Sequence, residues 1–267
     1  MIRIALVPLL LLTSCGPGDP SAPEGGVVSG RVTMEDGRPI SAPGAVVTIA
    51  IHGVAAKSGE RVQYAPAVKP DGTYRQKVVD GSYRVQRASL TLQHEGKTWT
   101  FHDLEPVPAV PGDREAAEGI VQNFVWKIRG RRPGTEGRPG NHTHWYGAPV
   151  ALNWAGYRED LKKASVPPPA GTTFTFTLAP TGPRIDGAPG ETLTIERAWD
   201  PGWGIQPLND IPRGSYGLSG HATLPDGTKE PLLFEASHGK YVPTLPVSFS
   251  PGQVGGPIHA FGFANLR

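Results

Sequence analysis

The chain has a single cysteine, Cys15, among its 267 residues. One thiol cannot form a disulfide within the chain, and it cannot build a zinc site from several thiolates. Neither sign of charge dominates, because the formal net charge is only +2. Such a balance gives no broad electrostatic field that would attract nucleic acid. We therefore predict no nucleic-acid partner.

The sequence also lacks the short motifs of common enzymes. It has no Gly-x-Ser-x-Gly nucleophile elbow, no glycine-rich phosphate loop ahead of a helix and no dinucleotide-binding fingerprint. Serine, histidine and acidic residues are present, but no spacing among them singles out a catalytic triad. The sequence predicts a protein that is not an enzyme and carries no cofactor.

The N-terminus has the layout of a secretory signal. Arg3 precedes the apolar stretch 4–12, and two small polar residues lead from there to Cys15. The apolar stretch is too short to span a bilayer. The order of these features predicts export from the cytoplasm.

The four residues that end this segment, Leu12, Thr13, Ser14 and Cys15, resemble the lipobox of bacterial lipoproteins. The resemblance implies that residues 1–14 are removed and that the sulfur of Cys15 carries a diacylglyceryl group. Acyl chains would then anchor the protein to a membrane of the bacterial cell envelope. An ordinary signal peptide with an incidental cysteine is the alternative.

Glycine and proline separate short segments of alternating polarity over most of the chain. Residues 15–26 have no apolar periodicity and are predicted to form a flexible tether. From residue 27 onward, apolar side chains recur at every second position, which is typical of half-buried strands. Short strands divided by Asp-Gly turns predict an all-β fold with two antiparallel Greek-key-type β-sandwich domains in tandem.

Four motifs near the start of this region resemble a carboxypeptidase regulatory-like domain. They are Gly30-x-Val32, Gly37-x-Pro39-Ile40, Asp71-Gly72-x-Tyr74 and Gly81-x-Tyr83-x-Val85. The resemblance covers about residues 27–105 and implies a transthyretin-like Greek-key β-sandwich that has no catalytic role. Tyr83 is expected to bury its ring while its hydroxyl reaches a backbone partner.

The rest of the chain predicts a connector at 106–118, with room for one helical turn, and a second β-sandwich at 119–267. Alternation starts again in the stretch 120–128, and a short helix is expected at 157–165. The stretch 81–92 is echoed by 214–224, which favours a second sandwich of related type. Twelve positions are too few to establish a duplication.

Metal sites are weakly indicated. His102 and Glu105 form a His-x-x-Glu pair with His238 far downstream, but their surroundings predict strands and a linker rather than a peptidase domain. His142 and His144 could chelate a metal if they lay on a strand, yet no nearby carboxylate completes the site. A solvated loop is the simpler interpretation for this pair.

Arginine and aromatic side chains gather in the same stretch. Arg131 and Arg132 precede Trp145 and Tyr146, and this set could bind a glycan by stacking or an acidic partner by guanidinium forks. The alternative is that the two rings are buried while the arginines remain solvated. Trp199 and Trp203 form a second set of the same kind.

These observations favour a lipid-anchored, non-enzymatic envelope protein that binds a protein or glycan partner. An envelope hydrolase with histidines gathered by the fold is one alternative, and a structural spacer is another. A hydrolase would require histidines to converge with a carboxylate in one concave site.

Overall fold

The computed structural model of the chain describes residues 22–102, 104–109, 112–136, 142–158, 160–249 and 258–263. These residues contain strands and two short 3-10 turns, Ala116–Glu118 (η1) and His142–His144 (η2), and no α-helix. The prediction of an all-β fold is confirmed. No helix in the described ranges is long and apolar enough to cross a membrane. Cys15, the predicted signal and most of the predicted tether lie outside the described residues.

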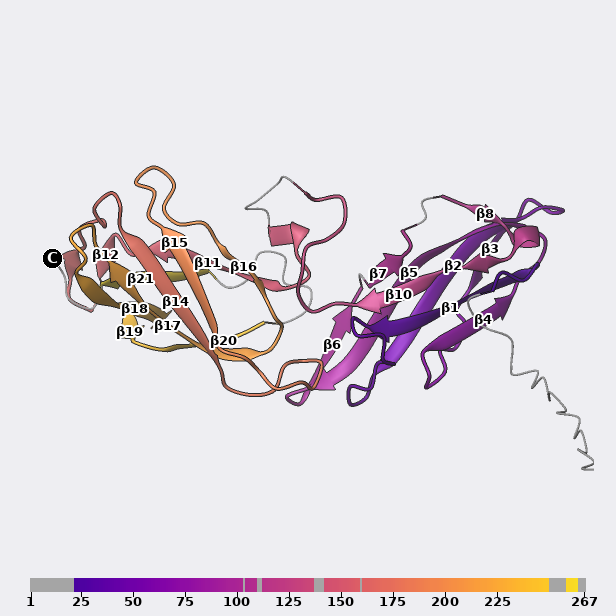
Figure 1. The fold of residues 1–267 in the computed structure, drawn as a ribbon, viewed down its shortest axis with the longest axis horizontal. Helices are drawn as coiled ribbons and strands as arrows, with labels where there is room; N and C mark the ends of the chain where they lie inside the picture. The colour runs from indigo at the N-terminus through magenta and orange to yellow at the C-terminus, as the bar shows by residue number, and fades with distance from the viewer. Residues whose placement is uncertain are drawn as a thin grey trace, which may run out of the picture.

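Two sheets face each other in the N-terminal lobe, drawn in indigo to magenta in Figure 1. One sheet has the strand order β4-β1-β10-β7, with β9 also paired to β1, and the other has the order β3-β2-β5-β6, with β8 also paired to β5. The first sheet comprises β1 (Val27–Met34), β4 (Thr73–Lys77), β7 (Glu105–Val107), β9 (Ile120–Val121) and β10 (Asn123–Trp126). The second comprises β2 (Val46–Ala55), β3 (Arg61–Tyr64), β5 (Gly81–His94), β6 (Lys97–Phe101) and β8 (Arg114–Glu115).

A single nine-stranded sheet builds the other lobe, in the order β15-β14-β17-β18-β21-β11-β16, with β19 paired to β18 and β20 to β17. Its first members along the chain are β11 (Ala148–Trp154), β14 (Thr173–Pro180), β15 (Leu193–Ala198), β16 (Leu208–Ile211) and β17 (Ser215–Thr223). The others are β18 (Lys229–Ser237), β19 (Lys240–Val242), β20 (Leu245–Ser248) and β21 (Ile258–Phe263). Strand β17 pairs with β20 at one end and with β18 at the other, so the sheet divides there into two layers.

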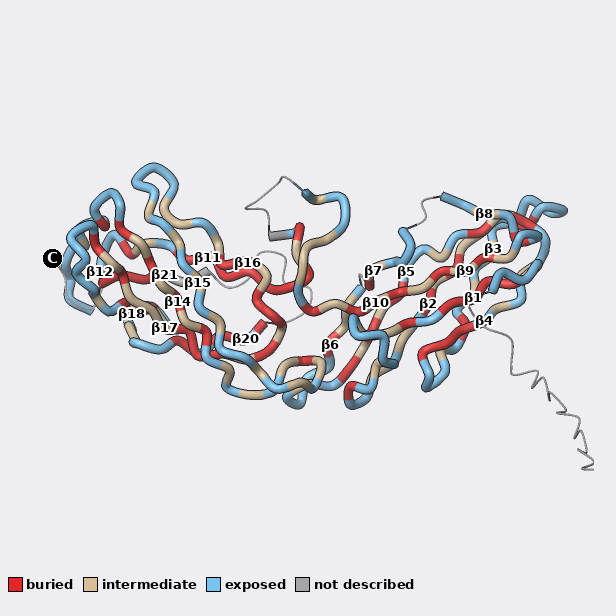
Figure 2. The backbone as a smooth tube through the Cα atoms, viewed as in Figure 1, coloured by how far each residue is buried: buried red, intermediate tan, exposed pale blue. Residues whose placement is uncertain are grey.

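Each lobe encloses its own hydrophobic cluster, and the buried segments of both lobes are red in Figure 2. The first cluster contains Ile49, Tyr83 and Leu90, all fully buried. The second is dominated by phenylalanines, among them Phe174, Phe176 and Phe261. Both clusters arise from the inward positions of the alternating segments, as a sandwich requires.

The strands expected to open the second sandwich belong to the first one. Strands β9 and β10 run parallel to β1, with Val28 opposite Ile120 and Val32 opposite Phe124. Ile120, Phe124, Trp126 and Ile128 join the first hydrophobic cluster. The predicted start of a second β series at residue 119 is therefore wrong. Alternation of apolar and polar residues predicts that a segment is a strand, but it does not determine which strand pairs with it.

A close approach of two backbones fixes this parallel pairing. Gly30 has no side chain, and a Cβ placed there would lie 1.9 Å from the carbonyl oxygen of Gln122. The buried hydroxyl of Tyr74 donates a 2.6 Å hydrogen bond to the same oxygen. Burial raises the pKa of Tyr74, so the hydroxyl keeps its proton and remains a donor.

Two local predictions have different outcomes. The helix expected at 157–165 is wrong, because Tyr157–Arg158 (β12) and Lys163–Ala164 (β13) form a small hairpin instead. The single helical turn expected in the connector is present as η1. The run 157–165 is too short for a helix to nucleate there without tertiary support.

The tyrosines of the two similar segments, 81–92 and 214–224, are buried alike, but their hydroxyl groups have different hydrogen-bond partners. Tyr83 and Tyr216 are both buried. The hydroxyl of Tyr216 donates to the carbonyl oxygen of Pro212 at 2.9 Å. The Tyr83 hydroxyl makes no bond to a backbone acceptor among the described residues, and its ring lies 6.1 Å from that of Tyr64. The expected ring burial of Tyr83 is confirmed, and the expected backbone bond is wrong.

The loop between β14 and β15 reaches from the second lobe to the first. Its residue Ile185 is 2% exposed and packs in the first hydrophobic cluster, while its backbone N–H donates to the backbone carbonyl oxygen of Arg213 at 3.1 Å. The Arg213 guanidinium lies 5.7 Å from the ring centre of Phe101. The packing of Ile185 and the contact of Arg213 with Phe101 join the two lobes.

Candidate functional site

The predicted arginines and aromatic residues lie on two paired arms, residues 130–132 and 144–146, between the strands of the two lobes. We call these two arms the excursion. Arg131 and Trp145 form a β-bridge. The N–H of Arg132 donates to His144, and the N–H of Tyr146 donates to Gly130, at 2.8 and 2.9 Å. The pairing brings together residues that are 14 positions apart in the sequence.

Each of the two rings is covered by an arginine of the facing arm. The Arg131 guanidinium lies 5.2 Å from the ring centre of Trp145, and that of Arg132 lies 4.6 Å from the ring centre of Tyr146. Tyr146 is buried, and Trp145 is half-buried. The contacts are typical of cation–π pairs, so one face of each ring is already occupied within the chain.

A cavity of about 570 Å³ lies between this excursion and the first sandwich. Arg132 and Tyr146 form one side of it, and β5 forms another. Its described lining contains three arginines and one histidine, Arg84, Arg87, Arg132 and His102, and no Asp or Glu. We call it the cationic cavity.

The electrostatics around the cationic cavity reflect this excess of arginine. Burial and, as a smaller contribution, the positive charge of nearby Arg132 together lower the pKa of Arg213 to about 10. Burial also lowers the pKa of Arg114, whose guanidinium bonds to Val121 and Gln122. Arg84 has a partial counter-charge in Asp113, at 3.7 Å. The electrostatic attraction of an anion to the cavity should therefore be stronger than its attraction to a neutral surface.

A β-bulge brings Arg84 and Arg87 to the same face of β5. The register of β5 against β2 shifts at Gln86, since Val85 lies opposite Ile51 and Arg87 lies opposite Ala50. Residues three apart point to opposite faces of a regular strand, and one extra residue reverses this. No sequence motif singles out either arginine. The sequence does hold a signal of the bulge: the inward residues Tyr83 and Leu90 are an odd number of positions apart, whereas inward residues of a regular strand are separated by an even number.

The carboxylate of Asp210 ties the excursion to the second lobe. Its Oδ1 accepts the N–H of Gly130 at 2.6 Å and that of Gly147 at 3.3 Å. Burial raises the pKa of Asp210, although the two N–H bonds act in the opposite direction. The excursion is therefore held at its base, which positions Arg132 and Tyr146 at the cavity.

The histidines that the structure describes do not assemble a metal centre. Over the described ranges no three His, Cys, Asp or Glu side chains are grouped so that they could hold an ion. His102 is exposed at the cationic cavity, whereas Glu105 pairs with Lys127 at 2.8 Å, and His238 is exposed elsewhere. His144 is buried in η2, and the side chain of His142 lies outside what the structure describes.

The second aromatic pair is split between core and surface. Trp199 packs against Trp154 and Phe174, with ring centres 6.1 and 6.2 Å apart. Trp203 is 87% exposed. The structure does not bring the two rings into one platform.

Comparison with known proteins identifies no family. No protein-family model and no curated protein sequence matches the chain. Among solved structures, the chain is similar to a variant of the major pilin subunit of Bacillus cereus, with 9% identity and a TM-score of 0.23 over 90% of this chain and 99% of that one. It is also similar to a tetra-tandem repeat in the extending region of a large adhesion protein, with 10% identity and a TM-score of 0.18 over 90% and 74% of the two chains. Similarity at this level carries no argument about the function of the protein.

Proposed function

We propose that the protein is a lipid-anchored, non-enzymatic protein of the bacterial cell envelope that binds an acidic partner in the cationic cavity. The observation that carries this proposal is the lining of that cavity, where three arginines and a histidine meet with no acidic residue in the described lining. Carboxylates are the natural ligands of such a set, because guanidinium groups donate paired hydrogen bonds to them. A carboxylate-bearing glycan and an acidic segment of a protein share this chemistry.

The proposal divides the chain into two β-sandwich domains after a tether. The first would be a carboxypeptidase regulatory-like module, extended by β9 and β10 beyond the stretch that carries the motifs. The separate hydrophobic clusters support two domains. The tether would separate the two domains from the membrane, so the cationic cavity would bind the acidic partner at a distance from the membrane surface.

Binding of acidic probes tests the cavity. We expect an oligogalacturonate or an oligoglutamate to bind the soluble protein, and neutral maltohexaose not to bind. The double variant Arg84→Ala/Arg87→Ala removes two charge-assisted donors and should weaken the binding by about a hundredfold or more, since each such bond contributes roughly 1.5–3 kcal/mol. Titration calorimetry at low and high salt measures the effect.

The control for this experiment is Lys57→Ala, which removes an exposed cation from the turn after β2. It should leave the affinity unchanged. Equal binding of the neutral sugar, or no binding of either acidic probe, would contradict the proposed role of the cavity.

The anchor is tested separately by growing cells with labelled palmitate. The full-length protein should incorporate the label and fractionate with membranes, whereas Cys15→Ala should lose both properties because it lacks the acceptor sulfur. Cys15→Ser serves as the size-matched control and should behave like the alanine variant. Retained label in either variant would refute the anchor at this residue.

A further inference from the structure

The cationic cavity continues into a second hollow on the other side of Arg84. This second hollow has a volume of about 360 Å³ and lies over strands β2 and β3. Arg84 belongs to the lining of both hollows, and Gly112 of the first directly precedes Asp113 of the second. The two hollows therefore form one surface depression, which we call the extended groove.

Strand pairing aligns polar side chains across the floor of the second hollow. His52 of β2 lies opposite Gln63 of β3 on one side and opposite Arg84 of β5 on the other. Directly opposite residues project from the same face of a sheet. This face is the outer one, because Ile51, the neighbour of His52, points into the first hydrophobic cluster. The row crosses two strand spacings, so it extends the polar surface by about 10 Å beyond Arg84.

Positive charge runs along the whole extended groove. Its described lining holds one carboxylate, that of Asp113, and four arginines, Arg61, Arg84, Arg87 and Arg132. The Asp113 carboxylate lies 3.7 Å from Arg84. Arg61 and Arg87 are exposed and form no ion pair within the part of the chain that the structure describes. The groove thus carries uncompensated positive charge on both sides of Arg84, which attracts anionic ligands.

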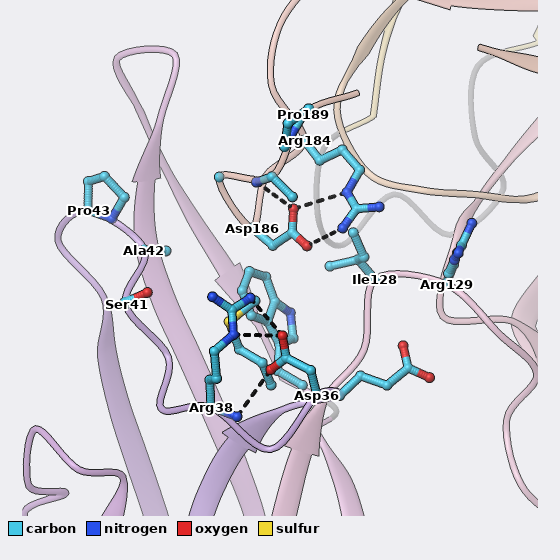
Figure 3. Close-up of a pocket in the computed structure, with 15 residues that line it drawn as sticks. Asp36, Arg38, Ser41, Ala42, Pro43, Ile128, Arg129, Arg184, Asp186 and Pro189 are labelled. Atoms are coloured by element: carbon cyan, nitrogen blue, oxygen red, sulfur yellow. Dashed lines mark hydrogen bonds and ion pairs between the residues drawn. The ribbon is translucent and has the colours of Figure 1, made fainter. Parts of the chain in front are cut away.

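A larger cavity of the molecule has no such excess of positive charge. This junction cavity, about 770 Å³ in volume, lies where the two lobes meet and is drawn in Figure 3. Its three arginines are each paired with a carboxylate at 2.6–2.7 Å, Arg38 with Asp36, Arg184 with Asp186 and Arg129 with Glu191. Charge therefore directs an anionic ligand to the extended groove and not to the junction cavity.

We propose that the extended groove binds a linear acidic glycan, a chain of uronate units with carboxylates at regular intervals. This inference rests on the proposed function of the cationic cavity and names the class of its partner. Arginines spaced along the groove donate paired hydrogen bonds to successive carboxylates. His52 and Gln63 offer donors as well as acceptors, which suits the sugar hydroxyls between the carboxylates.

An acidic peptide suits the second hollow less well than a glycan does. Strand β2 pairs with β3 on one side and with β5 on the other, so its backbone groups are already hydrogen-bonded. A peptide laid across these strands finds no free strand edge there, and its own backbone groups lose water without gaining partners. A uronate chain has no amide backbone and needs only the side chains.

The dependence of binding on glycan length tests the proposal. Hexagalacturonate should bind the soluble wild type at least about tenfold more tightly than digalacturonate, because only the longer chain gains a charge-assisted bond to Arg61. Arg61→Ala should remove this gain and leave the affinity for digalacturonate unchanged. Arg38→Ala is the matched control, because it also removes one exposed arginine, but from the junction cavity. It should leave both affinities unchanged.

A second variant and a peptide probe complete the test. His52→Ala removes a neighbouring side chain of the same hollow and should also weaken the binding of hexagalacturonate alone. Circular dichroism verifies that each variant is folded. Hexaglutamate places the same number of side-chain carboxylates on a peptide backbone. It should bind more weakly than hexagalacturonate, and its affinity should not respond to Arg61→Ala.

Three outcomes would overturn the proposal. They are equal affinities of the two uronates for the wild type, undiminished binding of hexagalacturonate by the folded Arg61→Ala and His52→Ala variants, and hexaglutamate binding of equal strength and equal sensitivity to Arg61→Ala. The last of these would assign the groove to an acidic peptide. If digalacturonate binding is lost in Arg84→Ala/Arg87→Ala but nothing is gained with length, the cationic cavity is supported and only its extension is rejected. Absence of binding by every acidic probe rejects both.

Discussion

A Gly30→Ala variant should unfold the first sandwich while the second stays folded. Its methyl group would lie 1.9 Å from the carbonyl oxygen of Gln122 and 2.9 Å from the hydroxyl of Tyr74. The nearest of these atoms belongs to the backbone, so no side chain can move aside. We expect a loss of about 4 kcal/mol or more in the free energy of unfolding, in the range of changes that a core cannot relax around.

Thermal and denaturant unfolding, followed by circular dichroism and tryptophan fluorescence, measures this loss. Two transitions are expected for the wild type, and only the one that reports Trp99 and Trp126 should move to lower denaturant. Gly156→Ala is the control, because a Cβ there meets nothing within 4 Å and should change stability by less than about 0.5 kcal/mol. An unchanged first transition in Gly30→Ala would contradict the parallel pairing of β1 with β9 and β10.

Phe174→Ala should destabilise the second sandwich by about 3–5 kcal/mol, the usual range for removing a buried phenylalanine ring. Phe174 is fully buried, and its ring centre lies 5.3 Å from that of Phe261 and 6.0 Å from that of Phe176. Trp154 and Trp199 complete its surroundings. The substitution would leave a cavity among these four aromatic rings, and the rings cannot close it without shifting several strands.

The same unfolding experiments separate this effect from that of Gly30→Ala. Only the second transition should move, and Phe174→Leu should retain much of the lost stability because it refills part of the volume. Trp203→Ala, an exposed change in the same lobe, is the control and should move neither transition by more than about 0.5 kcal/mol. Equal shifts of both transitions would show that the lobes unfold as one unit.

Local sequence patterns predict part of the candidate site but not all of it. Clustering along the chain indicated Arg132 and Tyr146, and both line the cationic cavity. Arg84 and Arg87 could not be found this way, because their shared face depends on a bulge opposite β2. The interpretation that Trp145 and Tyr146 are buried while the arginines stay solvated holds for Tyr146, but the arginines stack on both rings.

The sequence by itself determined that the chain forms short strands, because alternation of period two and positive-φ glycine turns are local properties. Turns at Gly37 and Gly72 have φ of +82° and +83°, as their Asp-Gly pairs predicted. Tertiary structure alone decided which strands pair. The return of residues 120–126 beside β1 and the insertion of Ile185 into the first core are contacts between distant segments. Such contacts depend on which closure buries the most apolar surface, and no short window of sequence contains that information.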